Sequence, residues 1–184
     1  MHPQITFRPL VDADLPAMKR WLEDPDVAWW YQAGSTAVEA LREHYRDEIA
    51  GTSRTRAFII GLDGRDAGYI QCYAIDDEPK YAQQIKVDPG AVGIDLFIGE
   101  SWARNRGYGR QVLRAFLAQI VFVKMGAEVA IIAPEPGNTR AVRSYERAGF
   151  VGWKIVYVVD KDAPQNTGQE YIMRLTREAF ESGE

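Results

Sequence analysis

The sequence predicts a single α+β domain built on a mixed sheet, and three observations indicate this fold. The chain has 184 residues, which is enough for one sizeable core but fewer than two ordinary domains need. Segments with strand and helix periodicity alternate along it, without internal repeats or a low-complexity linker. Their order places crossover connections in the second half of the sheet. One domain over residues 1–184 is therefore expected.

The first half of the chain predicts a strand at Gln4–Leu10, followed by a helix that Asp12 or Asp14 caps. A second amphipathic helix is expected over Val38–Ala50, where Gly51 ends it. The apolar residues expected on one face of the first helix are Leu15, Met18, Trp21 and Leu22.

A hairpin is predicted around Asp63 and Gly64, because this pair tolerates the positive φ angles of a tight primed turn. Its strands are expected at Arg56–Gly61 and Gly68–Ile75. The polar residues of Asp76–Gly90 are expected to form a loop. The elements predicted after that loop are strands at Val92–Ile98 and Glu128–Ala133, helices at Arg110–Met125 and Asn138–Ala148, and a final strand pair at Phe150–Val159 and Gln169–Leu175.

Composition and charge exclude several classes of function. An apolar fraction of 46% and a charged fraction of 26% are typical of a soluble globular protein without a membrane span. The first residues lack a secretory signal and Cys72 is the sole cysteine, so we expect a cytoplasmic protein. The net charge of −4 argues against nucleic acid and favours a cationic small-molecule partner. The two histidines lack partners at ligand spacing, so no metal is expected, and the protein is expected to be a monomer or homodimer.

The turn Arg104–Gly109 has the composition of an anion cradle. Gly107 and Gly109 lie between a predicted strand and a predicted helix, where backbone N–H groups and the positive helix end face one point. A complete dinucleotide-binding motif is absent, and the Gly-Lys-Ser/Thr of a phosphate-binding P-loop is missing. The turn alone leaves two interpretations open, a phosphate cradle or a helix start that needs glycine for its geometry.

Asp95 is a carboxylate within an otherwise apolar strand, where an unpaired charge would cost several kcal/mol. Strand alternation places it on the same face as Gly93 and Phe97. A buried ion pair or a cap would explain it structurally. A catalytic base, or an anchor for a substrate ammonium group, would explain it functionally.

A second motif runs from Asn138 to Phe150 and follows a predicted strand. Together with the turn it resembles the GNAT superfamily of acyl-CoA N-acyltransferases, whose first motif is matched by Arg104, Gly107 and Gly109, and whose second is matched by Asn138 and Tyr145. The resemblance implies a largely antiparallel central sheet flanked by helices, and acetyl-CoA as co-substrate. The residues expected to bind it are Phe97, Ile98, Arg104, Arg106, Gly107, Tyr108, Gly109, Arg110, Asn138 and Arg140.

Acetyl transfer to an amine requires a neutral amine, a stabilised carbonyl oxygen and a proton for the departing thiolate. Tyr145 suits the last role, because a phenol held within hydrogen-bond reach can protonate a thiolate. The alternative is a tyrosine that merely packs in the core. Tyr145 and Asp95 are therefore the predicted catalytic residues.

Within the superfamily, the chain resembles aminoglycoside 6'-N-acetyltransferases in Val92–Glu100, in Trp29-Trp30-Tyr31 and in Gly68-Tyr69. This resemblance implies that Asp95 is the base, that Trp30 contacts a sugar, and that main-chain N–H groups near Phe97 bind the thioester carbonyl. Acidic loops would hold the antibiotic's ammonium groups. The residues expected to contact the substrate are Trp29, Trp30, Asp77, Glu78, Glu135 and Asp160.

Family members often have an Asp-Pro pair where this chain has Ala133-Pro134. We expect either that Glu135, Asp160 or the acidic loop at residues 76–78 supplies the missing carboxylate, or that the amine substrate differs. Two further functions are open. One is an acetyltransferase acting on a siderophore precursor such as hydroxylysine or on another small amine, and the other is an acyl-CoA-binding module without turnover.

Overall fold

The computed structural model describes residues 3–31, 34–159 and 167–183. Their seven strands form one sheet in the order β1-β2-β3-β4-β5-β7-β6. β4 and β5 run parallel, whereas β1 with β2, β5 with β7, and β6 with β7 run antiparallel. The predicted mixed, largely antiparallel sheet flanked by helices is confirmed.

The chain divides into two compact units, residues 1–71 with 96–108 and residues 72–95 with 109–184. Strands β3 and β4 contribute residues to both units. Each unit is described by itself, and the single domain over residues 1–184 stays a prediction.

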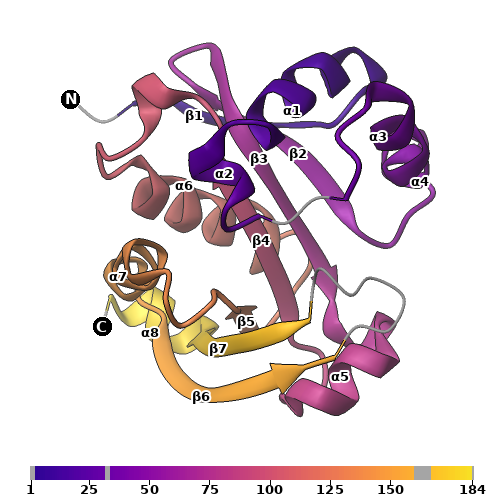
Figure 1. Ribbon diagram of the computed structural model, residues 1–184. Helices are drawn as coiled ribbons and strands as arrows, with labels where there is room; N and C mark the ends of the chain where they lie inside the picture. The colour runs from indigo at the N-terminus through magenta and orange to yellow at the C-terminus, as the bar shows by residue number, and fades with distance from the viewer. Residues whose placement is uncertain (1–2, 32–33, 160–166, 184) are drawn as a thin grey trace. The chain divides into compact units, whose positions relative to one another are not determined.

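The first unit contains the N-terminal strands and four short helices (Figure 1). Contacts join α1 to α2 and α3, and α3 to α4. β1 pairs with β2 from Ile5 opposite Leu62 to Pro9 opposite Phe58. The bounds of these elements are β1 Ile5–Pro9, α1 Leu15–Leu22, α2 Pro25–Ala28, α3 Val38–His44, α4 Arg46–Ala50, β2 Arg56–Leu62 and β3 Arg65–Ala74.

The core of the first unit is formed where α1 and α3 cover β2 and β3. The apolar face predicted for the first helix is confirmed, since all four of its residues are buried. They pack with Leu41, Tyr69 and Phe97 in one cluster. The hairpin turn is also confirmed, because φ is 50° at Asp63 and 77° at Gly64.

Two local predictions in this unit are wrong. Asp14 occupies the N-cap position of α1, but neither predicted aspartate caps the helix with its side chain. The carboxylate of Asp14 instead accepts hydrogen bonds from Arg8 and from the Val11 N–H group. The single helix predicted over Val38–Ala50 is broken at Tyr45, where ψ is 14° and the buried ring packs on Tyr69.

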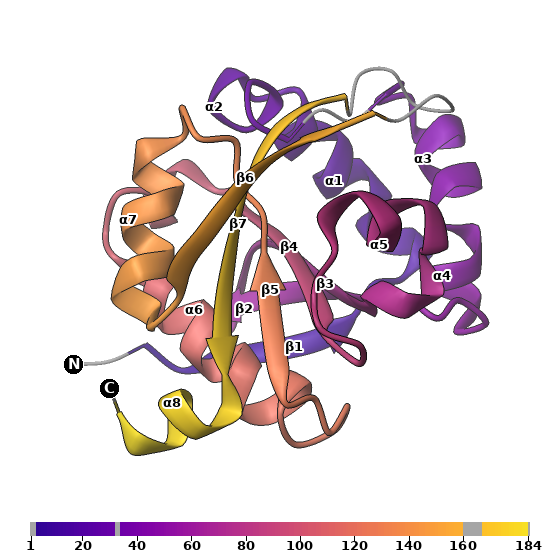
Figure 2. The same ribbon diagram turned by 90° about the horizontal axis from the view of Figure 1, so that it is seen from below.

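The second unit contains the C-terminal strands and four α-helices among its described residues. Figure 2 shows β6 and β7 as neighbours and α8 continuing from the end of β7. α6 continues as a π-helical turn at Leu117–Val121. The bounds of the other elements are α5 Pro79–Ile85, β4 Val92–Ile98, α6 Tyr108–Phe116, β5 Val129–Ile132, α7 Thr139–Ala148, β6 Val151–Val158, β7 Gly168–Thr176 and α8 Arg177–Ser182.

The loop predicted over Asp76–Gly90 is wrong, because α5 lies within it. Pro79 stands in the first turn, where its fixed φ suits a helix, and Lys86 ends the helix with φ of 47°. Ile85 is fully buried, and Tyr81 packs against the same apolar cluster. The short helix is held by this packing rather than by a long periodic pattern, which is why it was not predicted.

The helix predicted over Arg110–Met125 begins two residues earlier, at Tyr108, and its last part is the π-helical turn. The apolar residues of this segment are buried, namely Val112, Leu113, Phe116, Leu117, Ile120 and Val121. The short helices α2 and α8 were not predicted. No helix in the described part of the chain is long and apolar enough to span a membrane.

Candidate active site

Asp95 lies half-buried on β4, among four other ionisable side chains of the second unit. Its negative charge contributes to raising the pKa of Tyr73, Tyr81, Tyr145 and Glu170. The charge of Asp95 therefore acts on Tyr145, the other residue predicted to be catalytic, and on three residues that were not predicted, Tyr73, Tyr81 and Glu170.

Gly93 explains how a tyrosine reaches this group. A Cβ atom at Gly93 would lie 2.7 Å from the ring of Tyr73, so only glycine leaves room for the ring at this point of the strand. Burial is the main cause that raises the pKa of Tyr73, and the charge of Asp95 adds to it. The phenol stays protonated at neutral pH.

Tyr145 is positioned by α7, which is capped at both ends. The Asn138 side chain accepts a hydrogen bond from the Ala141 N–H group at 3.1 Å, and Gly149 ends the helix with φ of 109°. Burial and then the charge of Asp95 raise the pKa of Tyr145. This phenol therefore retains its proton at neutral pH.

Glu170 on β7 is one of the three residues that sequence reasoning missed. Its Oε2 atom accepts a hydrogen bond of 2.6 Å from the Tyr81 hydroxyl on α5. Burial, together with the charge of Asp95, raises the pKa of Glu170 from 4.5 to about 7, although the Tyr81 hydrogen bond opposes the shift. A carboxyl group in this environment exchanges its proton near neutral pH.

A sequence signal for Glu170 does exist. In a strand, residues two apart point to one face, so Glu170 shares its face of β7 with Ile172. Ile172 is fully buried in the cluster against which Tyr73 and Tyr81 pack. A glutamate that alternates with a core isoleucine marks a carboxylate at the edge of a core.

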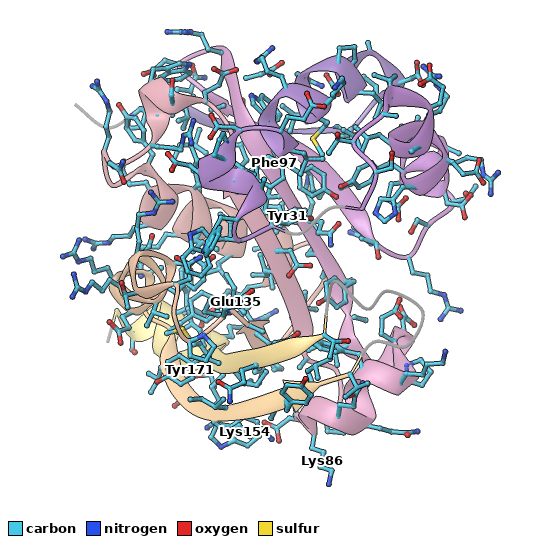
Figure 3. All side chains as sticks on the ribbon, viewed as in Figure 1. Tyr31, Lys86, Phe97, Glu135, Lys154 and Tyr171 are labelled. Carbon is cyan, nitrogen blue, oxygen red and sulfur yellow. The ribbon has the colours of Figure 1, made fainter. Side chains whose placement is uncertain are left out.

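Of the acidic residues predicted to contact the substrate, none in the described part of the chain is fully buried. Glu135 and Glu78 are exposed, and Asp77 is half-buried (Figure 3 labels Glu135). Asp160 lies outside the described residues. Ala133, where a family carboxylate was expected, packs against the same apolar cluster as Tyr81.

Aromatic residues of the first unit surround Phe97. Tyr31 lies against Phe97 with ring centroids 4.9 Å apart (Figure 3), and Tyr69 stacks on Phe97 at 5.6 Å. Trp29 is 72% exposed and packs edge-to-face on Trp30. A largely exposed tryptophan leaves an apolar surface open to a ligand, so the contact role of Trp29 and Trp30 stays a prediction.

The predicted cradle turn contains two residues in the left-handed backbone region. φ is 60° at Asn105 and 77° at Gly107, and a Cβ atom at Gly107 would meet no atom within 4 Å. The main chain at Gly107 is therefore open to a phosphate group. Ile98, Tyr108 and Gly109 are half-buried, whereas Arg106, Arg110 and Arg140 are exposed.

Arg104 is held by partners within the first unit. Its Nη1 atom lies 2.8 Å from Asp24 Oδ1 and 3.0 Å from Asp26 Oδ2, and the side chain is only 9% exposed. These ion pairs join the turn to α2. The geometry gives Arg104 the role of fixing the turn, and its contact with a phosphate stays a prediction.

The described residues contain no group of three or more histidine, cysteine, aspartate or glutamate side chains arranged to hold a metal ion. Cys72 is fully buried and lies against Met125.

The raised pKa of Glu170 predicts a pH dependence of stability. The unfolded chain releases this proton near pH 4.5 and the folded chain near pH 7. Proton uptake by the folded state stabilises it below pH 4.5, and this contribution is lost as the pH rises through about 7. Relative to Glu170→Gln, the wild type should lose up to about 3 kcal/mol of unfolding free energy across that window. Urea denaturation of both proteins at pH 4.5 and 8 measures this. If the difference in unfolding free energy between the two proteins is the same at both pH values, the prediction is contradicted.

Comparison with known proteins gives a consistent set of relatives. Residues 11–158 match the family described as an acetyltransferase (GNAT) domain. The aminoglycoside N(6')-acetyltransferase type 1 of Klebsiella pneumoniae is 27% identical over 182 residues, which cover 98% of this chain and 87% of the relative. The lysine N-acyltransferase MbtK of Mycobacterium sp. (strain MCS) is 29% identical over 148 residues, which cover 77% of this chain and 57% of the relative.

Among solved structures, the fold is similar to that of the aminoglycoside acetyltransferase AAC(6')-Ib in complex with coenzyme A and kanamycin. The TM-score is 0.80 at 26% identity, and the match covers 97% of this chain and 98% of that one.

Proposed function

Because the chain belongs to the acetyltransferase (GNAT) domain family, we propose that it transfers the acetyl group of acetyl-CoA to the 6'-amine of an aminoglycoside and so confers resistance to that antibiotic. The observation that carries the proposal is that the charge of Asp95 contributes to raising the pKa of Tyr145, the other predicted catalytic residue. The similarity to aminoglycoside 6'-N-acetyltransferases over nearly the whole chain supports the choice of acceptor.

Asp95 serves as the base in this proposal. An amine attacks a thioester carbonyl only in its neutral form, and the acceptor amine is largely an ammonium ion at neutral pH. Asp95 accepts the proton that the amine releases, directly or through water. The C–N bond then forms as the C–S bond of the thioester breaks.

Tyr145 serves as the acid. Desolvation and the charge of Asp95 raise its pKa, so the phenol is protonated at neutral pH but is a weaker acid than a free phenol. Donation to the thiolate therefore requires that the hydroxyl lie within hydrogen-bond reach of the sulfur atom. Tyr145 donates that proton to the sulfur atom. Asp95 and Tyr145 thus handle the two proton transfers of the reaction.

The coenzyme would be held by the turn at residues 104–109. The main chain at Gly107 is open to a pyrophosphate group, and Arg106 and Arg110 are exposed cations beside it in the sequence. In this proposal, Arg104 acts through its ion pairs with Asp24 and Asp26, which keep the turn in place.

The competing proposal is acetyl transfer to the side-chain amine of a hydroxylysine-type siderophore precursor, which the similarity to a lysine N-acyltransferase favours. Release of free thiol from acetyl-CoA distinguishes the two. We expect release with kanamycin and tobramycin, and little with hydroxylysine or peptide amines. Release confined to the latter compounds would exclude the aminoglycoside, and binding of acetyl-CoA without any release would indicate a non-catalytic module.

A further inference from the structure

Strand β6 carries most of the large apolar side chains that are open to solvent in the described part of the chain. Eight such side chains are exposed there, and five of them occupy alternate positions along β6 and the residue after it. A single exposed apolar residue is ordinary on a protein surface, whereas a contiguous group marks an interaction site. The five residues, here named the β6 strip, are Val151, Trp153, Ile155, Tyr157 and Val159.

The backbone of β6 is open along one side as well. β6 ends the strand order and pairs only with β7 among the described strands (Figure 2). In an antiparallel pair, alternate residues direct both backbone groups to the neighbouring strand, and the residues between direct theirs to the other side. Val159 is of the second kind, because its N–H group donates to Gln84 Oε1 at 2.7 Å and its carbonyl oxygen accepts from Gln84 Nε2 at 3.3 Å. Tyr157 and Ile155 stand two and four residues before it, so their backbone groups face the open edge.

This edge is protected at its first end only. Soluble proteins keep an exposed edge from pairing with bulges, prolines or lysine side chains. The bulge of β6 lies between Gly152 and Lys154 and leaves the strand from Ile155 onward regular. Lys154 is the single charged residue of β6, and its ammonium group is engaged, since it donates to the Lys86 carbonyl oxygen at 2.9 Å and lies over the Trp153 ring at 3.8 Å.

The area of the β6 strip is sufficient for a stable dimer. The exposed fractions of its residues lie between 43% and 67%, which corresponds to about 500 Å² of surface for side chains of these sizes. Two copies that cover each other's strips would bury about 1,000 Å², which is the least that a specific interface needs. The backbone hydrogen bonds of a shared ladder and the flanking atoms add to this contact.

We propose that β6 is the interface of a homodimer, in which β6 of a second copy pairs antiparallel with it about a two-fold axis near Ile155. Such an axis brings the same strip of both copies together and gives the backbone groups of Ile155 and Tyr157 their partners. It also places Lys154 opposite Val156 of the second copy, so the two lysines do not face each other. Of the monomer and the homodimer, which the sequence leaves open, this inference selects the homodimer, and it does not depend on the proposed reaction.

Light scattering after size-exclusion chromatography tests this over about 1 to 100 µM protein. Wild type should reach twice the monomer mass of 20.8 kDa. Ile155→Lys places two like charges opposite each other at the axis, so the Kd of the dimer should rise by about 100-fold or more. Tyr157→Lys should weaken the dimer in the same direction. Both residues are exposed in a single copy, so the far-UV circular dichroism of the two variants should match that of wild type.

A matched control and a second measurement make the test specific to β6. Val123 is 73% exposed and lies outside β6, so Val123→Lys should keep the dimer. Amide hydrogen exchange reports on the strand pairing itself. In wild type, the Tyr157 amide should exchange more slowly at high protein concentration than at low concentration, because it gains a partner only in the dimer.

A wild type that stays monomeric over the whole concentration range would refute the proposal. A dimer that survives both β6 substitutions forms through another surface and would refute it as well. Equal weakening by Val123→Lys would indicate non-specific association instead of a β6 interface. A Tyr157 amide that stays unprotected in the dimer would rule out pairing between the two strands.

Discussion

Replacing Asp95 with Asn is expected to lower kcat by about 10²- to 10⁴-fold, the usual contribution of a positioned general base. Asn has the shape of Asp but cannot accept a proton from the amine. Because Asp95 takes no part in holding the coenzyme in our proposal, the Kd for acetyl-CoA should stay unchanged. Initial rates of thiol release with kanamycin and calorimetric titration with acetyl-CoA measure the two quantities separately.

The matched control is Asp88→Asn, which makes the same change at an exposed residue whose ion pair with Arg174 is long, at 3.7 Å. Its rate should equal that of the wild type. An Asp95→Asn variant that keeps full activity would mean that Asp95 has a structural role and that another group is the base.

Replacing Gly68 with Ala is expected to destabilise the first unit by about 3 kcal/mol or more, as overpacking against a fixed backbone does. A Cβ atom at Gly68 would lie 2.3 Å from the Phe97 carbonyl oxygen and 3.0 Å from the Ile98 Cα atom. Both are backbone atoms of β4, so no rotamer change relieves the clash. Chemical denaturation followed by far-UV circular dichroism measures the loss.

Two other glycines separate this clash from the general effect of adding a methyl group. A Cβ atom at Gly168 would meet nothing within 4 Å and its φ is not positive, so Gly168→Ala should be nearly neutral. Gly64 is equally open but has φ of 77°, and Gly64→Ala should cost about 1 kcal/mol from backbone strain alone. Equal losses for all three variants would contradict the packing argument at Gly68.

Most strands and the long helices could be predicted because their signals are local. Alternation of apolar residues located β1, a nearly continuous apolar run located β4, and the positive-φ preference of Asp63-Gly64 located the hairpin turn. The failures occurred where a distant contact decides the structure. Tyr45 breaks a helix that its periodicity favours because its ring packs on Tyr69, and α5 is held by burial of Ile85.

The residues of the candidate site could likewise be predicted where their signal is local, and not where a distant contact decides their role. Asp95 was predicted because a carboxylate in an apolar strand is visible in one short segment, and Tyr145 because its motif is contiguous. The hydrogen bond between Glu170 and Tyr81 joins residues 89 positions apart, and no local pattern indicates it. The ion pair of Arg104 with Asp24 likewise spans 80 positions.

The central claim is that this protein acetylates the 6'-amine of an aminoglycoside. NMR spectroscopy of the product formed from kanamycin and acetyl-CoA tests it most directly, because the amine that carries the acetyl group can be assigned. We predict one acetyl group per kanamycin, on the 6'-nitrogen. Unmodified kanamycin, or an acetyl group on a different amine, would contradict the claim.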